Sequence, residues 1–351
     1  MPSRAHPAGT VCTRLLAALL VFASFAAFST ATRAASDAAS HAAITLYAGQ
    51  HQQMVRLLVD RFEKETGIPV KVRYGSGPEL AHALTLEGKR TTADVFFTED
   101  SPELMLLQEK DLLAAVDPAT LHQIPARFSS ADGKWVGVLA RENVLTWNPK
   151  LISADQLPKS LLELAQPRWK DRFGIHLTSA DIMPLIRAIA IKHGRPAALD
   201  WVKGVKRNAK LFQRNSGVVL AVNNGDVPVG VSNSYYYYRL REQVGADKMV
   251  SRVYHFANGD VGGLIDVSGA AALRYAPHPQ EAQRFLAFMV SEPVQDMLAR
   301  GTVDFEYPLR PGVVANPALK PFSELQPPDV TVTQLGDNRE ALQLLQEAGA
   351  L

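Results

Sequence analysis

Four consecutive tyrosines, residues 235–238, stand out in a chain that contains only nine. They follow an apolar segment, residues 227–231, and the helix that they open would end at Gly245. One interpretation is structural: Asn233 or Ser234 caps the helix, and the aromatic rings pack against neighbouring elements. In the other, adjacent phenols at the start of the helix point to one spot and bind a hard cation through their oxygens.

The acidity of the phenols decides which cation would fit. A tyrosine titrates near about pH 10, so ionising one at neutral pH costs roughly 4 kcal/mol. A divalent ion has little need of such ligands when carboxylates, carbonyls or imidazoles are available. A trivalent ion gains enough from each anionic oxygen to offset the deprotonation. If a metal ion binds here, the tyrosines favour Fe(III).

Strand and helix patterns place two more candidate ligands beside a sheet edge. Residues 44–47, 68–74 and 93–97 are typical of strands separated and followed by helices, and this βαβαβα order predicts an α/β fold with a parallel sheet. His51 follows the first strand and Glu99 the third, at the edge where open parallel sheets bind ligands. Taken singly, each is also compatible with an ordinary residue at a helix N-terminus.

The remaining elements follow from the same patterns. The helix after the first strand ends at Gly67 and carries one apolar face, namely Met54, Leu57, Leu58 and Phe62. Further strands are predicted within residues 134–147, 173–177, 227–231, 252–256 and 264–267, and further helices within 181–193, 196–208, 280–290 and at the C-terminal end. Residues 141–147 are a candidate crossing into a second domain.

The N-terminus indicates export. The first 34 residues have a short polar start with Arg4 and Arg14, then an apolar run, then small residues before Ala34, which is typical of a cleaved secretory signal peptide. No segment approaches the roughly 20 apolar residues that a membrane span requires. We therefore expect no membrane insertion. The sole cysteine, Cys12, lies in the leader, so we expect an exported mature chain without a disulfide or a thiolate metal site.

Charge and motifs argue against several other functions. Three of the 37 basic residues lie in the leader, which leaves 34 against 35 acidic residues, so no nucleic-acid partner is indicated. The sequence lacks a G-x-S-x-G elbow, an H-E-x-x-H helix, a P-loop and a C-x-x-C pair.

The chain as a whole resembles the periplasmic ferric-iron-binding proteins of bacterial ABC importers, which are often likened to transferrins. The resemblance covers nearly all of the mature chain. It rests on Tyr-Ala-Gly-Gln-His at 47–51, Ala-Asp-Val-Phe-Phe-Thr-Glu at 93–99, Asn-Ser at 215–216, Asn-Ser-Tyr-Tyr at 233–236, Ser-Gly-Ala-Ala at 268–271 and Glu-Tyr-Pro-Leu-Arg at 306–310.

The resemblance implies a two-lobed type II periplasmic binding protein, in which each lobe is a mostly parallel sheet flanked by helices and a hinge cleft lies between them. Lobe 1 would comprise residues 44–143 and 267–316, and lobe 2 residues 144–266 and 317–351. A signal peptide at 1–34 and a disordered mature N-terminus at 35–43 would precede them.

The resemblance also assigns the site. The metal ligands would be His51, Glu99, Tyr235 and Tyr236, which leaves two positions of an octahedral Fe(III) ion for water or a synergistic anion such as carbonate or phosphate. That anion would lie near four residues, partly at helix N-termini: Ser179, Ala180, Asn215 and Asn233. The protein would be a monomer without enzymatic activity that closes around Fe(III) and delivers it to an inner-membrane ABC permease.

Two other functions stay open on the sequence. One is the binding of a free oxyanion or a small organic solute. The other is a secreted metalloenzyme, which would need an open coordination position and a general base.

Asp181 departs from the phosphate-binding pattern of the family, which has small uncharged residues in this loop. Its carboxylate either caps the helix that contains Pro184, with the proline at N3, or faces the cleft and repels a multiply charged anion. In the second case, iron would bind with a weakly charged partner such as bicarbonate, or with water alone.

Overall fold

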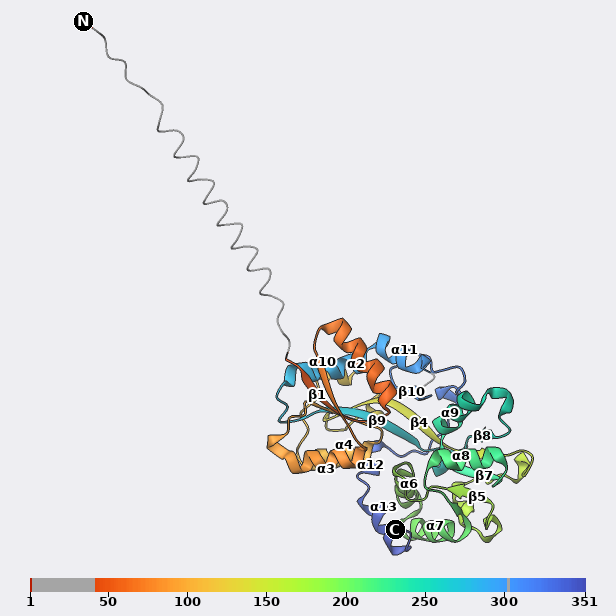
Figure 1. The fold of residues 1–351 in the computed structure, drawn as a ribbon. Helices are drawn as coiled ribbons and strands as arrows, with labels where there is room; N and C mark the ends of the chain where they lie inside the picture. Colours follow the sequence, from red (N-terminus) through yellow and green to blue (C-terminus); the bar gives the residue numbers. More distant parts are fainter. Residues whose placement is uncertain (2–41, 302–303) are drawn as a thin grey trace. The chain divides into compact units, whose positions relative to one another are not determined.

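The computed structural model describes residue 1 and residues 42–301 and 304–351. The predicted signal peptide, Cys12 and most of the predicted disordered N-terminus lie outside these residues. The segment Ala42–Leu351 forms one compact unit, coloured along the sequence in Figure 1. Within the described residues, no helix is both long enough and apolar enough to cross a bilayer.

The described part of this unit contains ten strands and twelve α-helices. The strands are β1 (Ile44–Gly49), β2 (Val70–Tyr74), β3 (Val95–Thr98), β4 (Val136–Trp147), β5 (Phe173–Ile175), β6 (Lys210–Leu211), β7 (Val229–Asn233), β8 (Arg252–Tyr254), β9 (Ile265–Ala272) and β10 (Tyr307–Pro308). The helices are α2 (Gln52–Thr66), α3 (Gly77–Glu87), α4 (Ser101–Glu109), α5 (Pro118–Leu121), α6 (Met183–His193), α7 (Arg195–Asn208), α8 (Asn215–Asn224), α9 (Ser234–Val244), α10 (Pro279–Met289), α11 (Glu292–Arg300), α12 (Val332–Leu335) and α13 (Arg339–Glu347).

A mixed sheet runs through the unit. Its main path has the order β2-β1-β3-β9-β4-β7-β5-β6, and β8 and β10 both pair with β4. Strand β1 is parallel to β2 and β3 at one end, and β5 is parallel to β6 and β7 at the other. The middle ladders β3–β9, β9–β4 and β4–β7 are antiparallel. The predicted α/β class is therefore confirmed, but the expectation of mostly parallel sheets did not include this antiparallel middle.

Strand β4 links two hydrophobic cores. All twelve of its residues are buried. Residues 136–140 contribute Val136, Val138, Leu139 and Ala140 to the first core, whereas Leu145 and Trp147 belong to the second. The change occurs within the predicted crossing at 141–147. The division into two lobes with the boundaries given above stays a prediction.

Helix α2 follows the local signals closely. It begins directly after His51 and ends at Gly67, whose φ of 70° lies in the left-handed region that favours glycine. The prediction that Leu57 belongs to the buried face is wrong, because this side chain is 49% exposed. The buried stripe runs through Val55 and Val59, which turns Leu57 toward solvent.

Strand β9 is longer than predicted, because it continues through the small residues at 268–272. Gly269 explains why small side chains are needed there. A Cβ atom at this position would come within 2.7 Å of a Leu104 side-chain carbon and 3.1 Å of the Trp135 ring. The small residues therefore let helix α4 and Trp135 pack closely on the strand.

Candidate metal centre

The four predicted ligands follow the C-terminal ends of three strands. His51 lies just beyond β1, Glu99 directly follows β3, and Tyr235 and Tyr236 lie in the first turn of α9, which follows β7 without a loop. The ends of β1 and β3 meet because the two strands are parallel neighbours. The sheet topology therefore brings these side chains to one place, as ligand sites in open α/β sheets require.

Three of the predicted ligands are in mutual contact. His51 Nε2 lies 3.5 Å from Glu99 Oε1, and the Tyr235 hydroxyl donates a hydrogen bond of 3.1 Å to the same carboxylate oxygen. The rings of His51 and Tyr235 meet edge to face, with centroids 5.3 Å apart. This arrangement gathers one nitrogen and two kinds of oxygen donor around a common point.

Tyr236 lies beside this group and faces Asp181. The two tyrosine rings have centroids 4.0 Å apart. The Tyr236 hydroxyl donates a hydrogen bond of 3.1 Å to Asp181 Oδ2, and the amide of Asn215 donates to the same oxygen. Asn215 also lies 3.4 Å from the hydroxyl of Ser179.

The orientation of Asp181 decides between the two interpretations of this residue. Helix α6 begins at Met183, which places Pro184 at the second helical position and not at N3, and no side chain caps this helix. Residues 180–182 form a separate 3₁₀ turn. The capping interpretation is therefore wrong, because the Asp181 carboxylate accepts hydrogen bonds from Tyr236 and Asn215.

Two of the four predicted anion-binding residues, Asn233 and Ala180, take no part in the side-chain hydrogen bonds that link Tyr236, Asp181, Asn215 and Ser179. Asn233 donates from its side-chain amide to Asp266 Oδ2 at 2.9 Å, at the level where β7 pairs with β4. Ala180 lies in the turn next to Asp181. The structure thus brings the Asn215 amide to the Tyr236 hydroxyl at 3.4 Å and to the Ser179 hydroxyl, while the amide of Asn233 is bound to Asp266.

Arg141 is the buried cation of the site, and sequence reasoning did not assign it a role. Its guanidinium is fully buried and pairs with Asp100, while the same nitrogen lies 3.5 Å from Asp181 Oδ1. It also donates to the main-chain oxygen of Glu99. The polar strand residues at 141–143 were the available signal, since charged residues in a buried strand need partners.

Asp304 and Glu306 were missed as well. Asp304 Oδ1 lies 2.8 Å from His51 Nδ1, so it can hold the imidazole with Nε2 directed at Glu99. Ligand atoms of His51, Glu99 and Glu306 all lie within 4.8 Å of one another. Both acids belong to a segment without a strand or helix pattern of its own, which is why periodicity did not reveal them.

The pKa values of His51 and Glu306 are both raised. Burial lowers the pKa of His51, but the contact with Asp304 and the charge of Glu99 outweigh this effect and raise it to about 9. Burial raises the pKa of Glu306 to about 8, although Arg141 opposes the shift. A cation that binds here must therefore displace protons at neutral pH.

The two phenols are still harder to ionise. Burial is the main cause that raises the pKa of Tyr235 well above its usual range, and the charges of Glu99 and Asp181 add to it. Burial and Asp181 likewise raise the pKa of Tyr236. Only a strongly charged cation offsets such a deprotonation.

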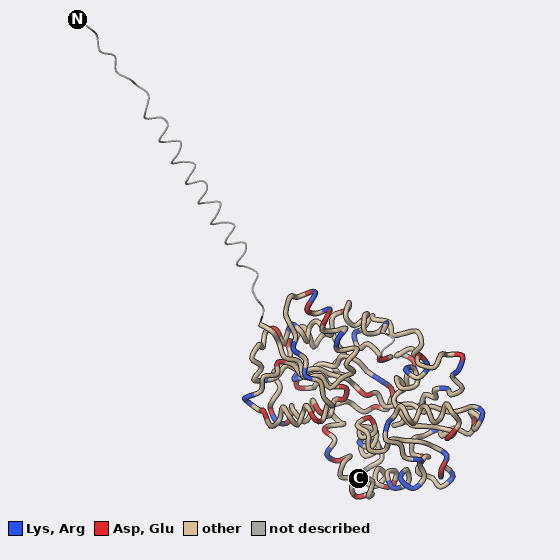
Figure 2. The backbone as a smooth tube through the Cα atoms, viewed as in Figure 1, with Lys and Arg blue, Asp and Glu red and all other residues tan. Residues whose placement is uncertain are grey.

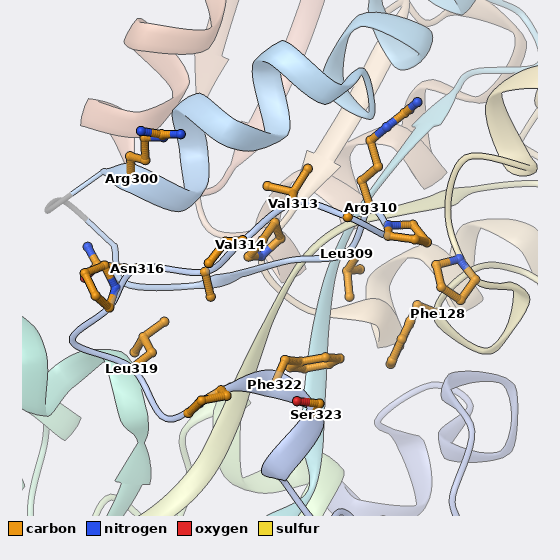
Figure 3. Close-up of a pocket in the computed structure, with 17 residues that line it drawn as sticks. Phe128, Arg300, Leu309, Arg310, Val313, Val314, Asn316, Leu319, Phe322 and Ser323 are labelled. Carbon is orange, nitrogen blue, oxygen red and sulfur yellow. The ribbon is translucent and has the colours of Figure 1, made fainter.

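A separate apolar cavity lies elsewhere on the unit. It has a volume of about 850 Å³ and is lined by Phe128, Leu309, Val314, Leu319 and Phe322, among others (Figure 3). The described residues that line it include no Asp or Glu, and the Arg310 guanidinium donates to the Val290 carbonyl at 2.9 Å. The donor chemistry described above is therefore not part of this cavity.

The chain matches known proteins over most of its length. A family model of bacterial extracellular solute-binding proteins matches residues 58–326. The chain is 36% identical over 317 residues to the Fe(3+)-binding periplasmic protein of Serratia marcescens, covering 90% of this chain and 93% of that protein. It is 34% identical over 326 residues to a major ferric iron-binding protein of Neisseria meningitidis, covering 92% and 96% of the two chains.

The chain is also similar to a solved structure of an iron-bound protein. Iron-bound HitA from Pseudomonas aeruginosa aligns with a TM-score of 0.84 and 41% identity, over 88% of this chain and 99% of that one. The resemblance stated from the sequence is thus confirmed. The chain belongs to the bacterial extracellular solute-binding proteins, where its relatives include periplasmic ferric-iron-binding proteins.

Proposed function

We propose that this protein captures Fe(III) at the cluster of His51, Glu99, Tyr235 and Tyr236 and delivers it to an inner-membrane ABC permease for iron import. The observation that carries the proposal is the contact of the buried Tyr235 phenol with the Glu99 carboxylate and the His51 ring, with the partly buried Tyr236 ring packed against Tyr235. The names of the relatives support the same cargo.

The donor set suits a trivalent ion. Two phenolates and one carboxylate would supply three anionic oxygens, which balance the charge of Fe(III), and the imidazole adds a nitrogen. A divalent ion would gain too little from the two phenols to offset their raised pKa values. The fit therefore depends on the charge of the ion as well as on the geometry of its ligands.

The route of delivery follows from the family. We propose a cleaved leader, a periplasmic location and a monomer that closes around the ion by a hinge at the strands between the two cores. Acidic and basic residues are interspersed along the backbone of the described residues (Figure 2).

We further propose that Asp181 limits the choice of synergistic anion. Its buried carboxylate already accepts hydrogen bonds from Asn215 and Tyr236, which are groups that would otherwise face an exogenous anion. A phosphate ion at this place would meet a negative charge in a poorly screened environment. Iron should therefore bind with bicarbonate or with water alone, and phosphate should not be required.

Titration of metal-free mature protein with Fe(III), supplied as its citrate, tests this function. Phenolate-to-iron charge transfer should produce a visible absorption band that saturates at one iron per chain, without hydrolytic activity toward ester or phosphoester substrates. Binding of an oxyanion or organic solute with no band on iron addition would instead support the other solute-binding function. Metal-dependent hydrolysis would support the metalloenzyme.

A further inference from the structure

Glu306 has no role in the four-residue site, yet its side chain lies in the same cluster. It directly precedes β10, which pairs with β4 at Ala140 and so holds Glu306 beside the buried middle of the sheet. Its exposed fraction is 2%. Its Oε2 accepts a hydrogen bond of 3.2 Å from the Ser268 hydroxyl, whereas Oε1 is buried and has no hydrogen-bond partner among the described residues.

An unpartnered buried carboxyl oxygen needs an explanation, because it loses its hydration without compensation. The position of Glu306 offers one. One ligand atom from each of His51, Glu99 and Glu306 lies within 4.8 Å of the other two. Bonds of about 2 Å place ligand atoms on opposite sides of an ion about 4 Å apart. A small contraction would therefore bring all three onto one ion.

We propose that Glu306 is a fifth protein ligand of the bound Fe(III) ion. It would enter on the side of His51 and Glu99 and take one of the two positions that four ligands leave to water or a small anion. Asp181 lies on the other side of the cluster, next to Tyr236, and is not needed for this assignment. The inference rests on the proposed function, since it concerns the coordination of the same ion.

If Glu306 had only a structural role, it would act on His51 through a chain of hydrogen bonds. Ser268 links Glu306 to the side-chain amide of Gln50, which donates to the Ser268 hydroxyl at 3.1 Å. The Gln50 side-chain oxygen in turn accepts from the backbone N–H of His51 at 2.8 Å. In that case, breaking the chain at Ser268 should have the same effect as changing Glu306.

The experiment compares the full mature protein with three variants. Glu306→Gln removes the anionic ligand, Ser268→Ala breaks the chain but leaves the carboxylate, and Glu103→Gln neutralises another buried glutamate with an unpartnered oxygen outside the three-residue group. Each protein is loaded with Fe(III) from its citrate and then desalted. The readouts are the phenolate band, the iron affinity and the relaxation rate of water protons, which rises when water coordinates the ion.

We expect Glu306→Gln to lower iron affinity at least about tenfold and to raise the water-proton relaxation rate above that of the wild type. Ser268→Ala and Glu103→Gln should keep the wild-type relaxation rate. If Glu306→Gln does not fold, Glu306→Asp replaces it. Its shorter side chain keeps the charge but recedes from the ion, so the relaxation rate should rise as well.

Two results would overturn the inference while leaving the function intact. One is a Glu306 variant that keeps the wild-type affinity, band and relaxation rate. The other is a Ser268→Ala or Glu103→Gln variant that reproduces the full change in relaxation. Absence of a phenolate band in the wild type would overturn the proposed function itself, so the two failures are distinguishable.

Discussion

The two sides of the candidate metal cluster differ in the pKa values of their side chains. On one side, the imidazole of His51 and the carboxyl of Glu306 have pKa values raised to about 9 and about 8. On the other, Tyr235 and Tyr236 are phenols whose pKa values rise above their usual range. The two phenols thus favour the binding of a highly charged ion. His51 and Glu306 make the iron affinity depend on pH near neutrality.

Removing either phenol should have the largest effect. Tyr235→Phe or Tyr236→Phe deletes an anionic oxygen, so iron affinity should fall by more than about a hundredfold, beyond the range typical of residues that only support a ligand. The charge-transfer band should shift or vanish. Absorption titration with ferric citrate measures both quantities.

The other two tyrosines of the run, Tyr237 and Tyr238, serve as controls. Tyr237 donates its hydroxyl to the Ser251 carbonyl at 3.2 Å, and the Tyr238 ring stacks on Phe305 with centroids 5.6 Å apart. Tyr237→Phe and Tyr238→Phe should therefore change iron binding little. Full colour and affinity in Tyr236→Phe would remove Tyr236 from the ligand set.

Acid should release the iron, and His51 should contribute to the pH dependence. The pKa of about 9 means that metal-free His51 carries a proton at neutral pH, and Fe(III) must displace it. Affinity should fall as the pH falls below about 9 and on through the mildly acid range. In His51→Gln, the logarithm of affinity should depend on pH less steeply, by about one proton. A variant with the wild-type pH profile would exclude His51 as a switch.

The anion requirement tests the environment of Asp181. Wild-type protein should bind Fe(III) equally well with bicarbonate or without added anion, and phosphate should give no increase. Asp181→Ala removes the negative charge that faces Asn215 and Tyr236, so phosphate should then strengthen binding. Iron affinity with phosphate, with bicarbonate and with neither provides the comparison. A strong phosphate requirement in the wild type that Asp181→Ala leaves unchanged would contradict the proposal.

Asp304→Asn should have a smaller effect on iron binding. Asp304 contacts His51 Nδ1 and orients the ring without being a proposed ligand, so affinity should fall about tenfold. The metal-free protein offers an independent readout, because the contact, together with the charges of Glu99 and Glu306, outweighs the effect of burial and raises the pKa of His51 from 6.5 to about 9.

The sign of that stability effect follows from the raised pKa. The contact stabilises the folded state fully below about pH 6.5, and this stabilisation disappears as the pH rises through about 9. Asp304→Asn should therefore lower the free energy of unfolding most at pH 6 and least above pH 9. Chemical denaturation at several pH values measures the difference, and an equal loss at all pH values would argue against the assigned contact.

Sequence reasoning proposed candidate ligands that directly follow strands, and the structure places them at those strand ends. His51, Glu99 and the tyrosine pair could be placed because a parallel sheet brings its strand ends to one edge. It did not identify Asp304, Glu306 or Arg141, because their contacts with His51, Ser268 and Asp100 join residues that are far apart in the sequence. The side chain of Asp181 was equally ambiguous, since a helix cap and a carboxylate that faces the cleft have the same sequence signature.

Anomalous diffraction from crystals of the iron-loaded protein tests the central claim most directly. We expect one iron peak in the space bounded by His51 Nε2, a carboxylate oxygen of Glu99 and the hydroxyl oxygens of Tyr235 and Tyr236, at bonding distance from all four. A peak that excludes either tyrosine, or iron bound only at the protein surface, would contradict the account.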